Sequence, residues 1–155
     1  MDFSFTEEQE LLAENLVEFM DREYPESLIK ECDEQKIFPV EANKKFYEAG
    51  FGAIGVPEEL GGVPADMVTM CLVTSIVYRY SWAGCTYSPL SIMNAADKAS
   101  PEIRTEMLEG LMSGEKRHSF GNTEPGAGSD AAGIKTSYKK VDGGYVINGH
   151  KIYNT

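Results

Sequence analysis

The stretch Phe120-Gly-Asn-Thr-Glu-Pro-Gly-Ala-Gly-Ser-Asp130 separates a long region of helical pattern from a short region of strand pattern. Gly126 and Gly128 have no Cβ atom, so the backbone there can take positive φ angles and approach another molecule closely. Pro125 removes one amide donor and stiffens the chain. The amides of such a turn can bind carbonyl or phosphate oxygens, although its composition alone favours an ordinary glycine-rich surface turn.

A helical pattern begins close to the start of the chain. Thr6 and Gln9 have the spacing of a capping box, in which each side chain accepts a hydrogen bond from the other residue's amide. Apolar residues then recur at helical spacing. We therefore predict a helix over residues 6–22, which Pro25 prevents from continuing.

Two further helical segments follow this first one. Pro39 suits the first turn of a second helix whose left-handed end falls at Gly50, with Phe46 and Ala49 facing the core. Residues 65–80 are apolar on nearly every side, which predicts a helix buried among other helices.

Two shorter helices are predicted before the glycine-rich stretch. Residues 88–99 form the first, with Pro89 in its first turn. Ser100-Pro101-Glu102 begins the second by supplying a cap, a first-turn proline and a first-turn acid, and this helix ends near Gly114. Its apolar stripe consists of Ile103, Met107, Leu108 and Leu111. About five helices with short joints describe an all-α helical bundle domain over residues 1–115.

The apolar period changes to that of strands after the last predicted helix. Residues 133–141 and 145–147 alternate around turn residues 142–144, which predicts a hairpin. Residues 151–155 look like a third strand. Three strands are near the minimum that stands alone, so residues 116–155 are expected to be the truncated start of a β domain. The predicted fold class is α+β.

The charge and the apolar runs exclude several classes of function. The formal net charge is -11, from 25 acidic and 14 basic residues, which argues against a nucleic-acid partner. The apolar run 67–77 is too short and too polar to span a bilayer, so no membrane insertion is expected. The N-terminus opens with acids in place of a basic region, so no secretory signal is predicted.

The cysteines and histidines give no sign of a metal or disulfide site. Cys32, Cys71 and Cys85 are widely spaced, odd in number and free of any CxxC pattern, which is typical of reduced thiols in a cytoplasmic protein. Cys71 lies in a very apolar stretch and is predicted to be a core residue. His118 and His150 have no companion ligands at metal spacing.

Two other interpretations of the glycine-rich stretch have less support. Gly126 and Gly128 lack the third glycine of a dinucleotide-binding fingerprint, because residue 131 is alanine and no helix pattern follows. Glu124 and Asp130 could be imagined as a pair of catalytic carboxylates, but their positions favour capping or turn roles.

Three stretches resemble the acyl-CoA dehydrogenase family: Thr123-Glu-Pro-Gly-Ala-Gly-Ser-Asp130, Ala132-Gly-Ile-Lys-Thr136 and Tyr145-Val-Ile-Asn-Gly-His-Lys-Ile-Tyr-Asn-Thr155. The helical part is similar to the family's N-terminal domain at Phe5-Thr-Glu-Glu-Gln9, Val56-Pro-Glu-Glu-Leu-Gly-Gly62 and Pro101-Glu102. The resemblance thus covers nearly the whole chain. Met1-Asp-Phe and Glu31-Cys-Asp33 with Pro39 also look similar to the crotonobetainyl-CoA reductase branch, which works on carnitine thioesters.

The resemblance implies a protein of three parts: this helical domain, a β-barrel-like middle domain and a C-terminal four-helix domain. It implies an FAD-dependent enzyme of fatty acid metabolism that oxidises the Cα–Cβ bond of an acyl-CoA thioester. In the family, a carboxylate removes the α proton while the β hydride passes to flavin N5. That glutamate base corresponds to no residue of this chain, so we expect no catalytic residue here and an inactive fragment. Family members are commonly homotetramers that contact electron-transfer flavoprotein, so an acceptor of this kind and a homo-oligomer are implied.

The resemblance also implies two cofactor-binding segments. The segment along the flavin edge consists of Phe120, Gly121, Asn122, Thr123, Glu124, Pro125, Gly126, Ala127, Gly128 and Ser129. Thr123 would hydrogen-bond the pyrimidine side of the ring, and Ser129 would touch the CoA arm of the substrate. The second segment is Tyr153, Asn154 and Thr155. Tyr153 would lie along the isoalloxazine, and Thr155 would place its hydroxyl near N5.

Some positions depart from the usual pattern of the family. Asn154 stands where an apolar residue is usual, and Gly121-Asn122 are smaller and more polar than usual. Two alternatives to a dehydrogenase stay open on the sequence. One is a helical interaction module without chemistry, and the other is a sister activity such as an acyl-CoA oxidase.

Overall fold

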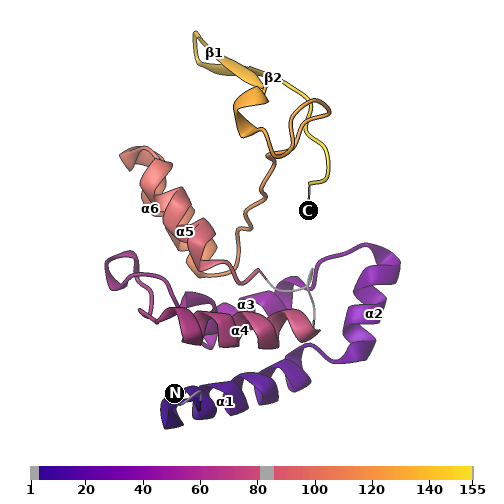
Figure 1. Cartoon of the computed structure of the whole chain (residues 1–155), viewed down its shortest axis with the longest axis vertical. Coiled ribbons are helices and arrows are strands. Elements are labelled where there is room, and N and C mark those ends of the chain that lie inside the picture. The colour runs from indigo at the N-terminus through magenta and orange to yellow at the C-terminus, as the bar shows by residue number, and fades with distance from the viewer. Residues whose placement is uncertain (1–3, 81–85, 155) are drawn as a thin grey trace. The chain divides into compact units, whose positions relative to one another are not determined.

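A computed structural model describes residues 4–80 and 86–154. The chain divides into two compact units, residues 1–117 and residues 118–155. The first contains the helices α1 to α6 and the second contains an antiparallel pair of strands, as Figure 1 shows. The fold class is α+β, as predicted.

Helix α1 spans Glu7–Glu23 and begins with the predicted capping box. Gln9 N donates to Thr6 Oγ1 over 3.2 Å, and Thr6 N donates to Gln9 Oε1 over 3.1 Å. One face of the helix is buried at Leu16, Phe19 and Met20. Both the start of this helix and its amphipathic character are therefore confirmed.

A second helix, α2 over Glu26–Gln35, was missed by the sequence interpretation. Pro25 follows the end of α1, as the sequence predicts. It also stands at the N-cap of α2 with φ of -62°, a value that the proline ring imposes and that suits entry into a helix. One proline thus ends α1 and precedes α2.

Helix α3 spans Val40–Glu48, one residue after Pro39. Gly50 follows it with φ of +85°, which confirms the predicted left-handed end. Phe46 is fully buried as predicted, whereas Ala49 is exposed and its predicted core position is wrong. The buried residues of this helix are Ala42, Asn43, Phe46 and Tyr47, so burial stops before the C-cap residue Ala49.

Helices α1 and α4 pack side by side and carry much of the core (Figure 1). The fully buried apolar side chains of this unit include Leu16, Met20, Tyr24, Phe46, Val56, Val73 and Val77. The connection between α3 and α4 contains the 3-10 turns Phe51–Ala53 and Glu58–Leu60 and an isolated parallel bridge between Ile54 and Val63. Rings also pack edge to face, with the centroids of Phe19 and Phe51 separated by 5.2 Å.

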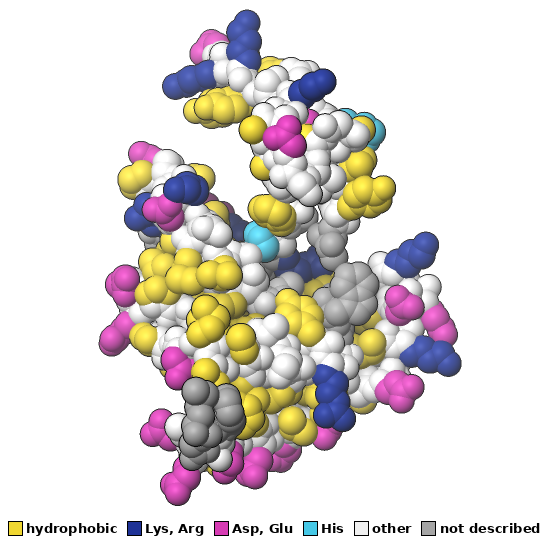
Figure 2. Space-filling model, in the orientation of Figure 1, with side chains coloured by type: hydrophobic (Ala, Val, Ile, Leu, Met, Phe, Trp, Pro, Cys, Tyr) yellow, Lys and Arg dark blue, Asp and Glu magenta, His cyan; other side chains and the backbone are white. Residues whose placement is uncertain are grey.

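Helix α4 spans Met67–Tyr80 and is buried along only one stripe, at Val73 and Val77. Met67 is 67% exposed, and Cys71 is exposed as well. The predictions of a helix buried all round and of a core Cys71 are therefore wrong for this chain. An apolar composition allows a helix to be buried on most sides, but the described residues cover only part of the α4 surface. Figure 2 shows hydrophobic side chains exposed among acidic ones on the surface.

Helices α5 over Pro89–Lys98 and α6 over Pro101–Met112 pack against each other. Both were predicted, including the proline in the first turn of each. Gly114 follows α6 in the left-handed region with φ of +72°. Leu111 of the predicted α6 stripe is buried, but Ile103 near its start is 56% exposed and does not face the core.

A buried asparagine fixes both ends of the α5–α6 pair to α3. Asn43 is fully buried, and its Nδ2 donates to the Gly114 carbonyl oxygen over 3.2 Å. Its Oδ1 accepts from the Thr86 amide at 3.1 Å and from the Thr86 hydroxyl at 3.0 Å. Because Thr86 precedes α5 and Gly114 follows α6, one side chain joins α3 to the beginning and the end of this pair.

The second unit contains strands β1 over Ser137–Val141 and β2 over Gly144–Asn148. They pair antiparallel with Tyr138 opposite Ile147, and the short 3-10 turn Ala131–Gly133 precedes them. The hairpin was predicted. The predicted third strand does not form over residues 151–154, and Thr155 lies outside the described residues.

No helix among residues 4–80 and 86–154 combines the length and the apolar character that crossing a membrane requires.

Candidate functional site

The glycine-rich stretch folds back on itself as a tight turn. Glu124 N donates to the Ala127 carbonyl oxygen over 2.9 Å, and Ala127 N donates to the Glu124 carbonyl oxygen over 3.1 Å. Gly126 and Gly128 are exposed, and neither takes a positive φ angle. A Cβ placed on either would meet nothing within 4 Å. Their lack of a side chain leaves open space beside the backbone, and the conformational freedom expected of them is not used.

The Glu124 side chain turns inward, away from solvent. Glu124 is 7% exposed, and its carboxylate accepts hydrogen bonds from Lys135 N at 2.7 Å and Thr136 N at 2.9 Å. The Thr136 hydroxyl donates to the same carboxylate. These bonds, with that of the Thr136 hydroxyl first among them, lower the pKa of Glu124 to about 2. The predicted turn role is correct for the backbone of Glu124, and its carboxylate additionally ties the turn to the segment before β1.

Lys151 ties the first segment that the resemblance assigned to the cofactor to the residues that lead into the second. Its Nζ lies 2.9 Å from Glu124 Oε1 and donates to the Asn122 carbonyl oxygen over 3.1 Å. The next residue, Ile152, donates its amide proton to the Thr123 carbonyl oxygen over 2.9 Å. Residues 120–129 and 153–154 therefore belong to one local structure.

Sequence reasoning missed Lys151 and Thr136 as part of this site. Both residues lie within the stretches that carry the family resemblance, but nothing in their spacing shows that they meet one carboxylate. Only the folded chain brings Lys151 to Glu124. A partly buried lysine is expected to pair with a carboxylate, but the burial of Lys151 cannot be read from the sequence.

The outer side of this structure presents two aromatic rings. Phe120 is 72% exposed and Tyr153 is 88% exposed, with Tyr153 held at a positive φ of 56°. Asn154 packs against Gly121, because a Cβ on Gly121 would lie 3.2 Å from Asn154 Oδ1. The two departures from the family pattern are thus neighbours.

The remaining predicted residues of the first segment differ in their exposure to solvent. Thr123 and Asn122 are partly buried, and Ser129 and Pro125 are exposed. Thr155 falls outside the described residues, so its place is not part of this geometry. Exposed rings beside an open, side-chain-poor backbone fit a flat aromatic group that bears hydrogen-bonding atoms at its edge.

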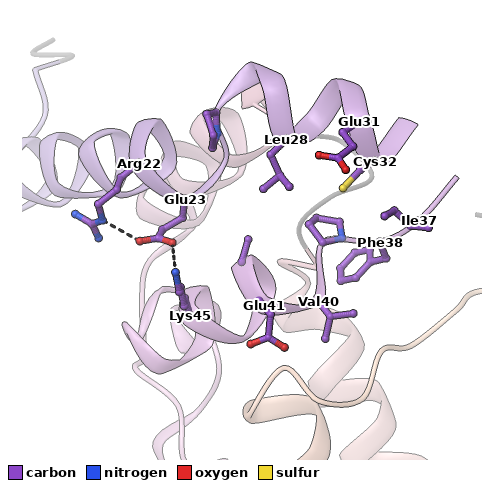
Figure 3. Close-up of a pocket in the computed structure, with 13 residues that line it drawn as sticks. Arg22, Glu23, Leu28, Glu31, Cys32, Ile37, Phe38, Val40, Glu41 and Lys45 are labelled. Carbon is purple, nitrogen blue, oxygen red and sulfur yellow. Dashed lines mark hydrogen bonds and ion pairs between the residues drawn. The ribbon is translucent and has the colours of Figure 1, made fainter. Parts of the chain in front are cut away.

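A separate cavity of about 530 Å³ lies between α2 and α3 of the helical unit (Figure 3). Leu28 and Phe38 give it apolar walls, and the buried Cys32 lies beside it. Glu23 at its edge contacts Lys45 at 2.6 Å and Arg22 at 2.9 Å. The hydrogen bond from Lys45, then that from Arg22, lowers the pKa of Glu23. These charges satisfy one another, and the cavity shows no arrangement suited to catalysis.

The metal-binding residue types do not gather anywhere in the described part of the chain. Among residues 4–80 and 86–154, no group of three or more His, Cys, Asp or Glu side chains is placed to hold a metal ion.

Comparisons with known proteins cover nearly the whole chain. The family model for the acyl-CoA dehydrogenase N-terminal domain matches residues 6–115. The probable acyl-CoA dehydrogenase YdiO of Escherichia coli K12 is 33% identical over 157 residues, which cover 100% of this chain and 41% of that protein. The chain therefore spans less than half the length of this relative.

Two solved structures share the fold at similar levels of identity. An acyl-CoA dehydrogenase complexed with FAD from Bacillus anthracis is 26% identical with a TM-score of 0.74, over 97% of this chain and 27% of that one. A structure described as the electron transferring flavoprotein of Acidaminococcus fermentans is 27% identical with a TM-score of 0.72, over 99% of this chain and 41% of that one.

Proposed function

The chain belongs to the acyl-CoA dehydrogenase family, and on that premise we propose that it is part of an FAD-dependent enzyme that oxidises the Cα–Cβ bond of an acyl-CoA thioester. The similarity to YdiO supports the oxidoreductase class, and the FAD complex from Bacillus anthracis supports the cofactor. One observation carries the proposal for this chain. The hydrogen bond from Ile152 N to the Thr123 carbonyl oxygen ties the first segment that the resemblance assigns to the flavin to the residue just before the second.

The proposed roles of the residues are to bind and to orient. The Thr123 hydroxyl would hydrogen-bond the pyrimidine edge of the flavin, and the exposed rings of Phe120 and Tyr153 would contact its faces or rim. Ser129 is exposed and would contact the CoA arm of the substrate. FAD, when bound, supplies the two-electron acceptor. The catalytic base is assigned to no residue of this chain.

The proposal extends to the electron acceptor and to the assembly of the enzyme. The likeness to the Acidaminococcus fermentans structure favours an electron-transfer flavoprotein or a similar acceptor. A homo-oligomer, with a homotetramer as the specific expectation, rests on the resemblance alone. Sedimentation of the complete enzyme, with and without such a flavoprotein, tests both points.

The deciding experiment uses the product of the complete reading frame that encodes these residues. We expect the purified protein to show the visible bands of oxidised flavin, and one of a panel of acyl-CoA thioesters to bleach them without oxygen. A colourless protein that takes up no added FAD would contradict the proposal. Rapid reoxidation of the bleached protein by oxygen would favour an oxidase over a dehydrogenase.

The 155-residue chain provides the matched control. We expect it to show no sustained turnover with FAD, acyl-CoA thioesters and a dye acceptor, because the proposed base lies elsewhere. Turnover by this chain would show that a catalytic group was overlooked.

A further inference from the structure

We propose that Glu124 and Lys151 form a positioning pair that fixes the two proposed flavin segments in one arrangement before the cofactor arrives. The part of this inference that concerns FAD rests on the proposed function. The part that concerns the arrangement of the segments does not.

The contacts of Lys151 make it a bridge between the segments. Its Nζ reaches both the Glu124 carboxylate at 2.9 Å and the Asn122 carbonyl oxygen at 3.1 Å, so one ammonium group holds a side chain and the backbone of the first segment. Lys151 itself stands two residues before Tyr153, which opens the second segment. The Lys151 side chain is 23% exposed, so its pairing with Glu124 is shielded from much of the solvent.

The Glu124 carboxylate also binds the segment that precedes β1. It accepts from two successive backbone amides, at Lys135 and Thr136, and from the Thr136 hydroxyl. A Cβ on Gly149 would lie 2.0 Å from Thr136 Oγ1, so only glycine at this position leaves room for the Thr136 side chain. A carboxylate bound in this way accepts strong, charge-assisted hydrogen bonds with defined directions.

Apolar burial offers little competing source of order in this unit. Both strands are exposed along their whole length, and Ala127 is its one buried hydrophobic residue among those described. The geometry of the site therefore depends on polar contacts. Among them, Lys151 with Glu124 joins the first segment to the residues that lead into the second.

Four variants and one control test the pair. Glu124→Gln keeps the shape and removes the charge, Lys151→Met removes the ammonium group, and the double variant tests their coupling. Lys151→Arg keeps the charge, and Lys139→Met removes an exposed lysine of β1 as the control. Each is made in the 155-residue chain and in the complete enzyme.

The first measurement is amide hydrogen exchange of the 155-residue chain without FAD. Glu124→Gln and Lys151→Met should each raise exchange at Thr136 and Ile152 by about tenfold or more, since a charge-assisted bond is lost. The double variant should resemble either single variant, Lys151→Arg should lie near wild type, and Lys139→Met should match it. Exchange unchanged in both single variants, or additive in the double variant, would overturn the pair.

The second measurement is FAD binding and the visible flavin spectrum of the complete enzyme. The same two single variants should bind FAD about tenfold more weakly and show a shifted flavin spectrum. Lys151→Arg should keep the wild-type FAD affinity and spectrum. Faster exchange with unchanged FAD affinity and spectrum would overturn the positioning role and leave a structural one. If the wild-type enzyme takes up no FAD, the proposed function fails along with this role, and exchange alone then decides whether the pair orders the segments.

Discussion

Different forces stabilise the interior of each of the two units of this chain. The helical unit buries Leu16, Phe46 and Val77 completely among apolar neighbours. The second unit leaves both strands exposed and buries a glutamate that accepts from two backbone amides and a lysine. The first therefore draws its stability from the hydrophobic effect, whereas the second draws its local geometry from hydrogen bonds and an ion pair.

The comparison shows that a few residues can specify the geometry of a binding site where polar contacts hold it. A packed core distributes its stability over many contacts, so its shape depends on all of them together. A polar network concentrates its stability in a few directional bonds. A single substitution can therefore change the geometry of the proposed site without unfolding the helices. Substitutions in the two units should therefore differ in their effect on global stability.

The largest effect is expected in the helical core. Phe46→Ala should lower the free energy of unfolding by about 3–5 kcal/mol, because it removes a fully buried ring and leaves a cavity. Tyr138→Ala is the matched aromatic substitution in the second unit, where the ring is 74% exposed and packs edge to face against the Tyr145 ring. It should lower the free energy of unfolding by about 1 kcal/mol or less. Urea denaturation followed by far-ultraviolet circular dichroism measures both. Similar costs for the two variants would contradict the contrast.

A smaller loss is expected from the buried asparagine. Asn43→Ala leaves the Gly114 carbonyl and the Thr86 amide without their partner, which should cost about 1–3 kcal/mol. Because Asn43 joins α3 to both ends of the α5–α6 pair, amide exchange should rise most in these two helices. Uniform exchange across the helical unit would show that this side chain does not have the specific role assigned to it.

The capping box of α1 should contribute less. Thr6→Ala removes the acceptor of the Gln9 amide at an exposed helix end and should cost about 1 kcal/mol. Thr6→Ser keeps the hydroxyl and serves as the control. Equal midpoints of thermal unfolding for the two variants would contradict this assignment.

The smallest global effect is expected from protonating Glu124 in the second unit. The folded-state pKa of Glu124 is lowered to about 2 from 4.5, so its stabilising contribution is complete above pH 4.5 and is lost as pH falls toward 2. The Thr136 amide resonance should shift and lose protection within this range. In Glu124→Gln that change should be absent. A Thr136 amide insensitive to acid in the wild-type chain would contradict the network.

Local signals in the sequence predicted much of the fold. The capping box at Thr6, the left-handed Gly50, the first-turn prolines of α5 and α6, and the hairpin were all found where the pattern placed them. Each depends on residues close together in the chain, where backbone sterics and capping act. The helix α2 was missed because a proline that ends one helix can also precede another.

Predictions that required knowledge of distant partners were less successful. Cys71 lies in an apolar run but is exposed, since burial depends on which elements pack against α4. Residues 151–154 have a strand pattern but form no strand, because pairing needs a neighbour. For the candidate site, the resemblance named the two segments, while the bond from Lys151 to Glu124 depended on the folded chain.

The most direct test of the account is amide exchange of the complete enzyme as FAD is added. We expect residues 120–129 and 153–154 to become protected together, at the same FAD concentration, while α1 does not change. Protection of only one segment, or of neither, would contradict the claim that these residues form one cofactor site.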